Sequence, residues 1–167
     1  VSAGDFNVLH SAGSTASRSD FSPQYTTLGA EPLKMSPKNG RPSDISAYPF
    51  FNIITPDKKG VVVGIGWTGT WFADIALKGK QGVNLASGMK TIDLHLYPGE
   101  TIRTPLVAML FWQGEDFMTG NNQFRRFILA HHTRKVDEEY AHSPLCGGFD
   151  WGDPAPCNEY SCLTEDF

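Results

Sequence analysis

The segment that most constrains the fold is the run VVVGIGW at residues 61–67. Its residues are apolar at odd and even positions alike, so a strand built from them has no face suited to water. Such a strand is stable only at the centre of a sheet, with other layers over both faces. The sequence therefore predicts a buried central strand here, and other parts of the chain must cover it.

Segments on both sides of this run are typical of strands. Residues 48–54 form one strand candidate before it. Residues 71–77 form another and are expected to close a hairpin with 61–67 across a short connection. Residues 83–86 predict a short strand after a further turn, and one or two short strands are expected in the loop-rich first 45 residues.

The segment 90–97 alternates apolar and polar residues. Its aliphatic side chains are expected to face the core and its other side chains solvent, with Ile92, Leu94 and Leu96 inside and Thr91, Asp93, His95 and Tyr97 outside. Pro98 and Gly99 then predict a type II turn, because proline presets φ and glycine supplies a positive φ. The apolar core of segment 102–112 is expected to cross the interior.

One helix is predicted after these strands. Residues of its buried stripe fall at i, i+3, i+4 and i+7, at Phe124, Phe127, Ile128 and His131. Thr119 or Asn121 is expected to cap it, and Arg125 and Arg126 lie off the stripe. Many strands followed by one helix predict a mainly β fold, a two-layer antiparallel β-sandwich of the supersandwich type with one C-terminal helix.

Composition and charge exclude several classes of protein. The net charge is −4 and no block of Lys and Arg occurs, so no nucleic-acid partner is expected. No apolar run approaches the roughly 20 residues of a membrane span. Cys146, Cys157 and Cys162 lack the spacing of a zinc site, and an odd count clustered at one end of the chain does not indicate a disulfide framework. They are expected to be thiols, with one disulfide as the alternative, and no metal or cofactor is predicted.

Several motifs occur in a distinctive order. They are GWTGTW at 66–71, GM at 88–89, LYPGETIRTP at 96–105 and NQFRRFILAHH at 122–132. In this order they resemble motifs of the melibiase-type α-galactosidases, glycoside hydrolase family thirty-six and its near relatives. The DFSP run at 20–23 resembles a G-D-F-R-x-P loop of that family, although Ser19 replaces its glycine and Ser22 its arginine. The GRPS run at 40–43, followed by the PFF run at 49–51, is a weaker match to a G-R-x-S…P-F-F run of the same family.

The resemblance implies a domain organisation. In that family an N-terminal β-sandwich precedes a (β/α)₈ barrel, whose two Asp residues act in a retaining mechanism. Residues 1–133 would be the sandwich with its closing helix. Residues 134–167 would be a linker and a remnant of the first barrel strand, disordered or docked away from its native place. No catalytic residue is then expected before Phe167, and this chain alone is expected to be inactive.

The resemblance also suggests substrate contacts. Asp150 and Trp151 would lie at the end of the first barrel strand, where an indole can stack on a sugar ring and a carboxylate can accept hydroxyl hydrogen bonds. Asp20 is the second candidate, because the corresponding loop of the family reaches the rim of the active site. A turn or cap role is the alternative for Asp20 and is the one favoured by its altered neighbours.

Other candidate residues have simpler interpretations. Trp67 and Trp71 would form a sugar platform or, as their residue type favours, pack in the core. Asp93, His95 and Glu100 could form an acid–base or metal site of a small enzyme. The alternation of the strand also explains them simply as polar residues that face solvent, and this is the favoured interpretation. The glycines of the GIGWTG run at 64–69 have the G-x-G-x-x-G spacing of a dinucleotide-binding motif. That motif requires a following helix within a βαβ unit, which is not predicted here, so a dinucleotide site is rejected.

The expected function is that of a non-catalytic domain of a glycoside hydrolase resembling α-galactosidase. Its partners would be the catalytic barrel of the parent chain and a galactoside or other oligosaccharide, with a homo-oligomer also considered. The alternative is an autonomous carbohydrate-binding module that presents exposed aromatic side chains. The residues leave the compartment open, and the resemblance favours an exported protein.

Overall fold

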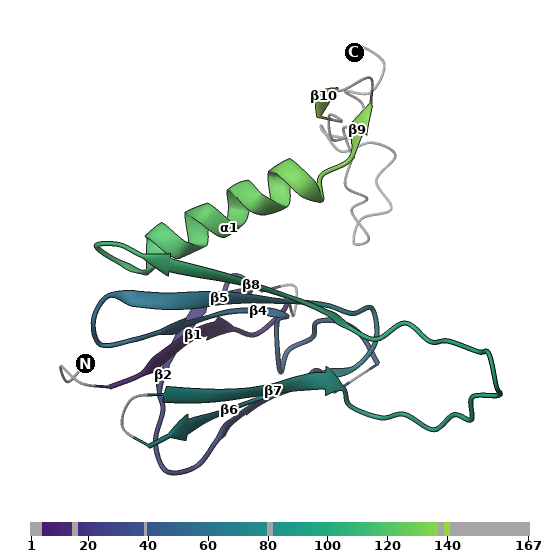
Figure 1. Cartoon of the computed structure of the whole chain (residues 1–167). Helices are drawn as coiled ribbons and strands as arrows, with labels where there is room; N and C mark the ends of the chain where they lie inside the picture. Colours follow the sequence, from purple (N-terminus) through teal and green to yellow (C-terminus); the bar gives the residue numbers. More distant parts are fainter. Residues whose placement is uncertain (1–4, 15–16, 39, 80–81, 137–138, 141–167) are drawn as a thin grey trace, which may run out of the picture. The chain divides into compact units, whose positions relative to one another are not determined.

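The computed structural model describes residues 5–14, 17–38, 40–79, 82–136 and 139–140 of the chain (Figure 1). The chain divides into two units, Val1–Ala130 and His131–Phe167. The described strands of the first unit are β1 (Asn7–Ser11), β2 (Pro23–Thr27), β3 (Leu33–Met35), β4 (Phe50–Ile54), β5 (Lys59–Gly66), β6 (Trp71–Lys78), β7 (Gly82–Met89) and β8 (Leu106–Gln113). The helix α1 (Phe117–His131) follows them. In the second unit, β9 (Lys135–Val136) pairs with β10 (Glu139–Tyr140), and the Lys135 ammonium lies 5.0 Å from the Tyr140 ring centroid.

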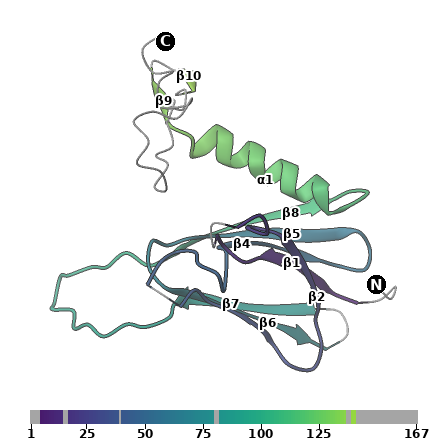
Figure 2. The same ribbon diagram turned by 180° about the vertical axis from the view of Figure 1, so that it is seen from behind.

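The first unit is a two-layer antiparallel β-sandwich with one helix, as the sequence predicts. One sheet has the strand order β2-β1-β4-β5-β8 and the other the order β3-β6-β7. The pairs within both sheets are antiparallel. The two sheets lie one above the other in both views, and α1 lies along the outer face of the larger sheet (Figure 2).

The main core lies between the sheets. Val8 and Val63 from the larger sheet meet Trp71 and Ile75 from the smaller one, and all four side chains are fully buried. The indole Nε1 of Trp71 donates a hydrogen bond to the backbone oxygen of Pro42 at 2.7 Å. Trp71 therefore fills the apolar interior without leaving its polar atom unpaired.

Strand β5 is covered on both faces. Val63 and Ile65 pack toward the smaller sheet, whereas Val62 packs on the opposite side with Trp112 of β8 and Phe124 of α1. The strand lies between β4 and β8, so its two edges are also paired. This confirms the prediction of a central buried strand and explains why a helix covers the outer face of the sheet.

A buried carboxamide joins the helix to the sheet. Asn52 of β4 is 1% exposed, and its Oδ1 accepts a hydrogen bond from Trp112 Nε1 at 2.9 Å. Its Nδ2 donates to Asn121 Oδ1 at 3.1 Å and to the Phe117 backbone oxygen at 3.4 Å. One side chain thus connects β4, β8 and the first turns of α1.

The predicted hairpin of residues 61–67 and 71–77 is wrong. Strand β6 belongs to the smaller sheet and pairs with β3 and β7, whereas β5 belongs to the larger sheet. Because β4 and β8 occupy both edges of β5, residues 67–70 carry the chain from one sheet to the other. The described part of the first 45 residues contains three strands rather than one or two, and β7 is longer than the predicted 83–86.

The predicted strand 102–112, with its apolar part 106–112 crossing the interior, is also wrong. Strand β8 begins only at Leu106 and forms an edge of the larger sheet. Met109 pairs in register with Val63 and Phe111 with Val61, yet they are 55% and 78% exposed. The smaller sheet therefore covers the neighbouring β5, but on the same face of β8 only Val107 packs against the core, and Met109 and Phe111 stay exposed.

Residues 90–97 form no strand, so the expected inward orientation of Ile92, Leu94 and Leu96 is wrong. Residues 91–105 form an extended arm between β7 and β8 that projects from the sandwich (Figure 1), and each residue from 91 to 104 is exposed. The cause lies in the register of β7, because Met89 already pairs with Trp71, the first residue of β6. The chain therefore runs past the end of its partner strand.

The tip of the arm confirms the predicted type II turn. Gly99 has a φ of 89°, and the Glu100 amide donates a hydrogen bond to the Tyr97 carbonyl oxygen at 3.0 Å. The Glu100 carboxylate also accepts a hydrogen bond from the Tyr97 amide at 2.9 Å. Local turn chemistry thus holds although the expected strand does not form.

Asp116 caps α1, so the predicted caps Thr119 and Asn121 are wrong. The Asp116 carboxylate accepts a hydrogen bond from the Met118 amide at 2.8 Å, and the helix begins at Phe117. An aspartate at this position satisfies one of the unpaired N–H groups of the first turn. Arg125 and Arg126 are exposed, as the predicted stripe requires.

The substitution Asn52→Ala is expected to lower the free energy of unfolding by about 1–3 kcal/mol, because it leaves the buried Trp112 N–H without its acceptor. Asn84→Ala on β7 removes the same atoms from an exposed position and is expected to change it by less than about 0.5 kcal/mol. Urea denaturation followed by circular dichroism measures both. Equal effects of the two substitutions would contradict the role given to Asn52.

The substitution Gly120→Ala is expected to destabilise the protein by about 1–3 kcal/mol, despite the better helix propensity of alanine. A Cβ at this position would lie 2.3 Å from Cδ1 of the Trp112 ring, so the helix would have to move. Asn122→Ala, at an exposed position of the same helix, is the matched control and keeps or slightly raises stability. Thermal unfolding of the two variants checks the difference, and a gain in both would disprove the close contact.

Candidate functional site

The loop that contains Asp20 joins β1 to β2 through two successive turns. The Asp20 amide donates to the Ser17 carbonyl oxygen at 3.1 Å, and the Ser22 amide donates to that of Ser19 at 3.2 Å. The Ser22 hydroxyl donates to the same Ser19 oxygen at 2.6 Å. Hydrogen bonds close in sequence therefore set the shape of this loop.

The Asp20 carboxylate is part of the same network. Ser17 Oγ donates to its Oδ1 at 3.2 Å, and the Ser14 hydroxyl donates to its Oδ2. The carboxylate thus links the end of β1 to the turn that follows. This geometry fits the turn role considered for Asp20, while sugar contact by this residue stays a prediction.

Phe21, which the sequence did not single out as a site residue, has an unusual backbone conformation. Its φ is 55°, in the left-handed region that a bulky residue enters at a cost of roughly 1–2 kcal/mol, and its side chain is 49% exposed. Its ring meets that of Tyr48 edge to face with centroids 5.2 Å apart. Tyr48 in turn contacts Phe50 at 5.2 Å, and Phe50 contacts Phe124 of α1 at 5.9 Å.

These rings form an aromatic row from the loop surface to the helix, so the strained residue rests on a rigid support. The resemblance had marked the Asp-Phe pair through Asp20 alone. No pattern in the sequence revealed the positive φ of Phe21. Asp150 and Trp151, the other predicted substrate contacts, lie outside the described residues, as do the three cysteines.

The two tryptophans of the GWTGTW motif pack rather than form a platform. Trp71 is fully buried, and Trp67 is half-buried against the same core. The dinucleotide interpretation is correctly rejected, because Gly64 and Gly66 lie within β5, opposite Ala108 and Leu106 of β8. The chain continues from there into β6 and not into a helix.

Asp93, His95 and Glu100 lie on the exposed arm rather than on a strand face, so the expected strand position is wrong. Glu100 is engaged in the turn at the tip of the arm. Within the described part of the chain, no group of three His, Cys, Asp or Glu side chains is placed to hold a metal ion. The described arm therefore holds no assembled metal centre.

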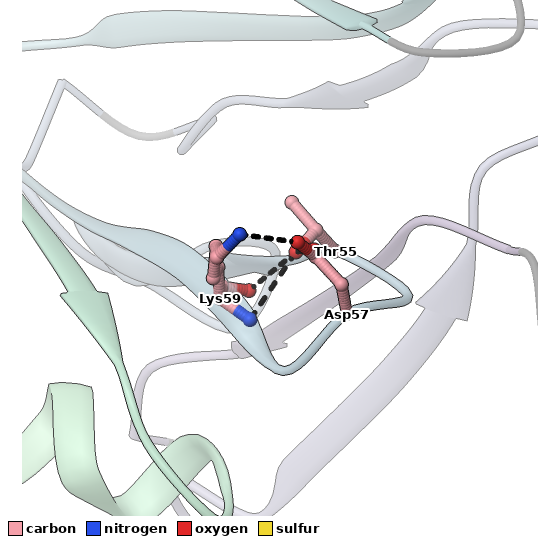
Figure 3. Close-up of polar contacts among 3 residues, drawn as sticks. All are labelled: Thr55, Asp57 and Lys59. Atoms are coloured by element: carbon pink, nitrogen blue, oxygen red, sulfur yellow. Dashed lines mark hydrogen bonds and ion pairs between the residues drawn. The ribbon is translucent and has the colours of Figure 1, made fainter.

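A second polar group closes the turn between β4 and β5 (Figure 3). Lys59 Nζ lies 2.7 Å from Asp57 Oδ2, and Thr55 Oγ1 donates to Asp57 Oδ1 at 2.5 Å. The hydrogen bonds from Lys59 and then from Thr55 lower the pKa of the Asp57 carboxyl. A general acid needs a raised pKa. These surface contacts are therefore better explained as stabilising the turn between β4 and β5.

His10 of β1 is half-buried at the sheet. Its Nε2 lies 2.9 Å from Thr26 Oγ1 on the neighbouring strand β2. Burial lowers the pKa of the imidazole, because the charged form loses its hydration. His10 therefore favours the neutral state in the folded protein.

Comparison with known proteins adds no assignment: no family model matches the sequence, and no curated protein matches it significantly. Among the described residues α1 is the single helix, and it lacks the length and hydropathy of a membrane span.

The pKa of His10 predicts a pH effect on stability. A lowered folded-state pKa contributes stability above the unfolded value of about 6.5, and this stability is lost as pH falls through the folded value. The free energy of unfolding of the wild type is therefore expected to fall more steeply between about pH 7 and pH 5 than that of His10→Gln. Urea denaturation at several pH values measures both curves, and parallel curves would contradict the assignment.

Proposed function

We propose that this chain is the non-catalytic β-sandwich domain of a glycoside hydrolase resembling α-galactosidase. Its role would be to support the catalytic barrel and to form part of the rim of the sugar site. The observation that carries the proposal is that the family-like motifs lie, in the same order, on a mainly β two-layer sandwich with one closing helix. Residues 66–71 cross between the sheets and bring Trp71 into the core, 96–105 contain the type II turn, and most of 122–132 lies in the closing helix.

Three of the described acidic side chains, Asp44, Asp57 and Asp116, have structural contacts. Asp44 is buried and accepts hydrogen bonds from the backbone amides of Lys38 at 2.7 Å and Ser46 at 2.8 Å. Asp116 caps the helix, and Asp57 fastens a turn. A retaining glycosidase instead needs two carboxyl groups about 5–5.5 Å apart across an open sugar site. The resemblance assigns that pair to a barrel, not to the sandwich.

The Asp20–Phe21 loop is the proposed rim contact. Backbone strain often persists at functional sites, where the surrounding structure holds it, and the Phe21 backbone is strained in this way. Its ring is half-exposed, and apolar ring faces stack on the C–H faces of sugars. The hydrogen bonds from Ser14 and Ser17 hold the loop in place, which reduces the entropy that binding would cost.

The same loop favours one second candidate, an autonomous carbohydrate-binding module. In that case Phe21 and Asp20 would bind sugar without a barrel. The two candidates differ in whether the isolated chain has measurable affinity, because a rim supplies only part of a binding site.

The purified chain is expected to show no turnover of a chromogenic α-galactoside above a blank without protein, since it would lack the catalytic pair. Reading of the coding region beyond Phe167 is expected to reveal barrel strands with two aspartates at strand ends. Clear turnover by the chain, or a downstream reading frame without such a barrel, would overturn the proposal.

Titration calorimetry with galactosides at millimolar concentration separates the two candidates. Flat titrations agree with a supporting domain. Saturable binding that is lost in Phe21→Ala, and retained in Phe111→Ala at another exposed aromatic residue, would assign the chain as a binding module instead.

A further inference from the structure

The arm between β7 and β8 exposes a strand-like sequence that has no partner strand within the described chain. Ile92, Leu94 and Leu96 alternate along its outgoing limb and are 54%, 48% and 50% exposed. Both views show the arm extending away from the two sheets (Figures 1 and 2). The backbone of this limb is therefore accessible to a second strand, and its alternation gives that strand one apolar face to cover.

We propose that the arm is a dimerisation strand, in which residues 91–97 pair antiparallel with the same residues of a second copy of this chain. Leu94 then lies opposite Leu94 of the partner subunit. Asp93 lies opposite His95 of the partner subunit, and the two-fold axis repeats this contact.

The apolar face limits the register. In an antiparallel pair, opposite residues point to the same side, so an aliphatic residue must face an aliphatic residue. This requires that Ile92, Leu94 and Leu96 meet one another, which excludes every register shifted by one residue. Centring on Leu94 brings all three aliphatic positions into pairs, with Ile92 opposite Leu96 of the partner subunit, whereas a shift by two residues leaves one position unpaired.

Charge selects the same register. With Leu94 at the centre, each Asp93 carboxylate faces a His95 imidazole, which can donate a hydrogen bond and, when protonated, carries the opposite charge. A shift of two residues in one direction places the two Asp93 carboxylates opposite each other, and a shift in the other direction does so for the two His95 rings. Carboxylates directly opposite each other are unfavourable, and a pair of His95 rings leaves both Asp93 carboxylates without a facing donor, so shape and charge agree on one pairing.

The pairing is isologous, because the same residues of both copies form it and the contact closes at two subunits. The open edge of β8 is a less suitable acceptor for this limb. Residues 106–113 contain no charged side chain to complement Asp93 and His95. A second copy of the arm matches both its apolar and its polar face.

The test is the oligomeric state in solution, measured by sedimentation velocity over a range of concentrations. The wild type is expected to be a dimer, and Leu94→Asp to raise the dissociation constant at least about tenfold, because it places two carboxylates at the centre of the pairing. Leu129→Asp on α1 is the matched control, since Leu129 is 47% exposed against 48% for Leu94. It is expected to leave the dimer unchanged.

An exchange of charges tests the register. His95→Asp alone sets carboxylate against carboxylate and is expected to weaken the dimer, whereas the combination of Asp93→His and His95→Asp restores opposite partners and the wild-type dissociation constant. Thermal unfolding of each variant confirms that the sandwich is intact, because these side chains are exposed in the single chain. A wild type that stays monomeric, a dimer indifferent to Leu94→Asp, no recovery in the double variant, or growth beyond a dimer through the β8 edge would each overturn the proposal.

Discussion

The need to cover both faces of β5 organises the structure. A second sheet buries Val63 and Ile65 but leaves the opposite face of the strand open, so a third layer is required. The helix supplies it, and Gly64 makes room for the ring of Phe124, which would lie 2.8 Å from a Cβ at that position. Asn52 then fixes the helix through hydrogen bonds to Asn121 and Phe117. The larger sheet therefore becomes the middle layer, with a core on each side.

Local patterns in the sequence predicted the elements better than their connections. Strand β5, the turn at Pro98–Gly99 and the stripe of α1 each depend on residues close together in the chain. Each is found, except that His131, the last residue of the predicted stripe, is exposed. Sheet membership depends instead on competition for strand edges. Because β4 and β8 pair with β5, the next strand has to join the other sheet, although its sequence suits a hairpin equally well. The start of the helix was predicted too late for a different reason. Aspartate is a common capping residue, but Thr119 or Asn121 was predicted as the cap in place of Asp116.

The candidate site was predictable in part. Asp20 was identified through a resemblance and its turn-forming residue type, and the structure adds the serine hydroxyls that orient its carboxylate. Phe21 was not identified, because its positive φ results from successive turns and from contact with Tyr48, which lies 27 positions along the chain. A conformation that depends on such a distant contact has no local signature. The burial of Trp71, in contrast, follows from the general behaviour of large aromatic residues.

The remaining errors concern residues that were expected to be buried and are exposed. An apolar pattern indicates that a surface needs cover, but it does not say whether the cover comes from the same chain. Strand β8 and the arm both show this difference, yet they are not equivalent. One face of β8 already lies under α1, and its other face is apolar and uncharged. The arm has an apolar face, and its polar neighbours, Asp93 and His95, face each other in the proposed two-fold pairing. That internal match is a property of the arm alone, and it makes a second copy of this chain the partner that best fits its surface.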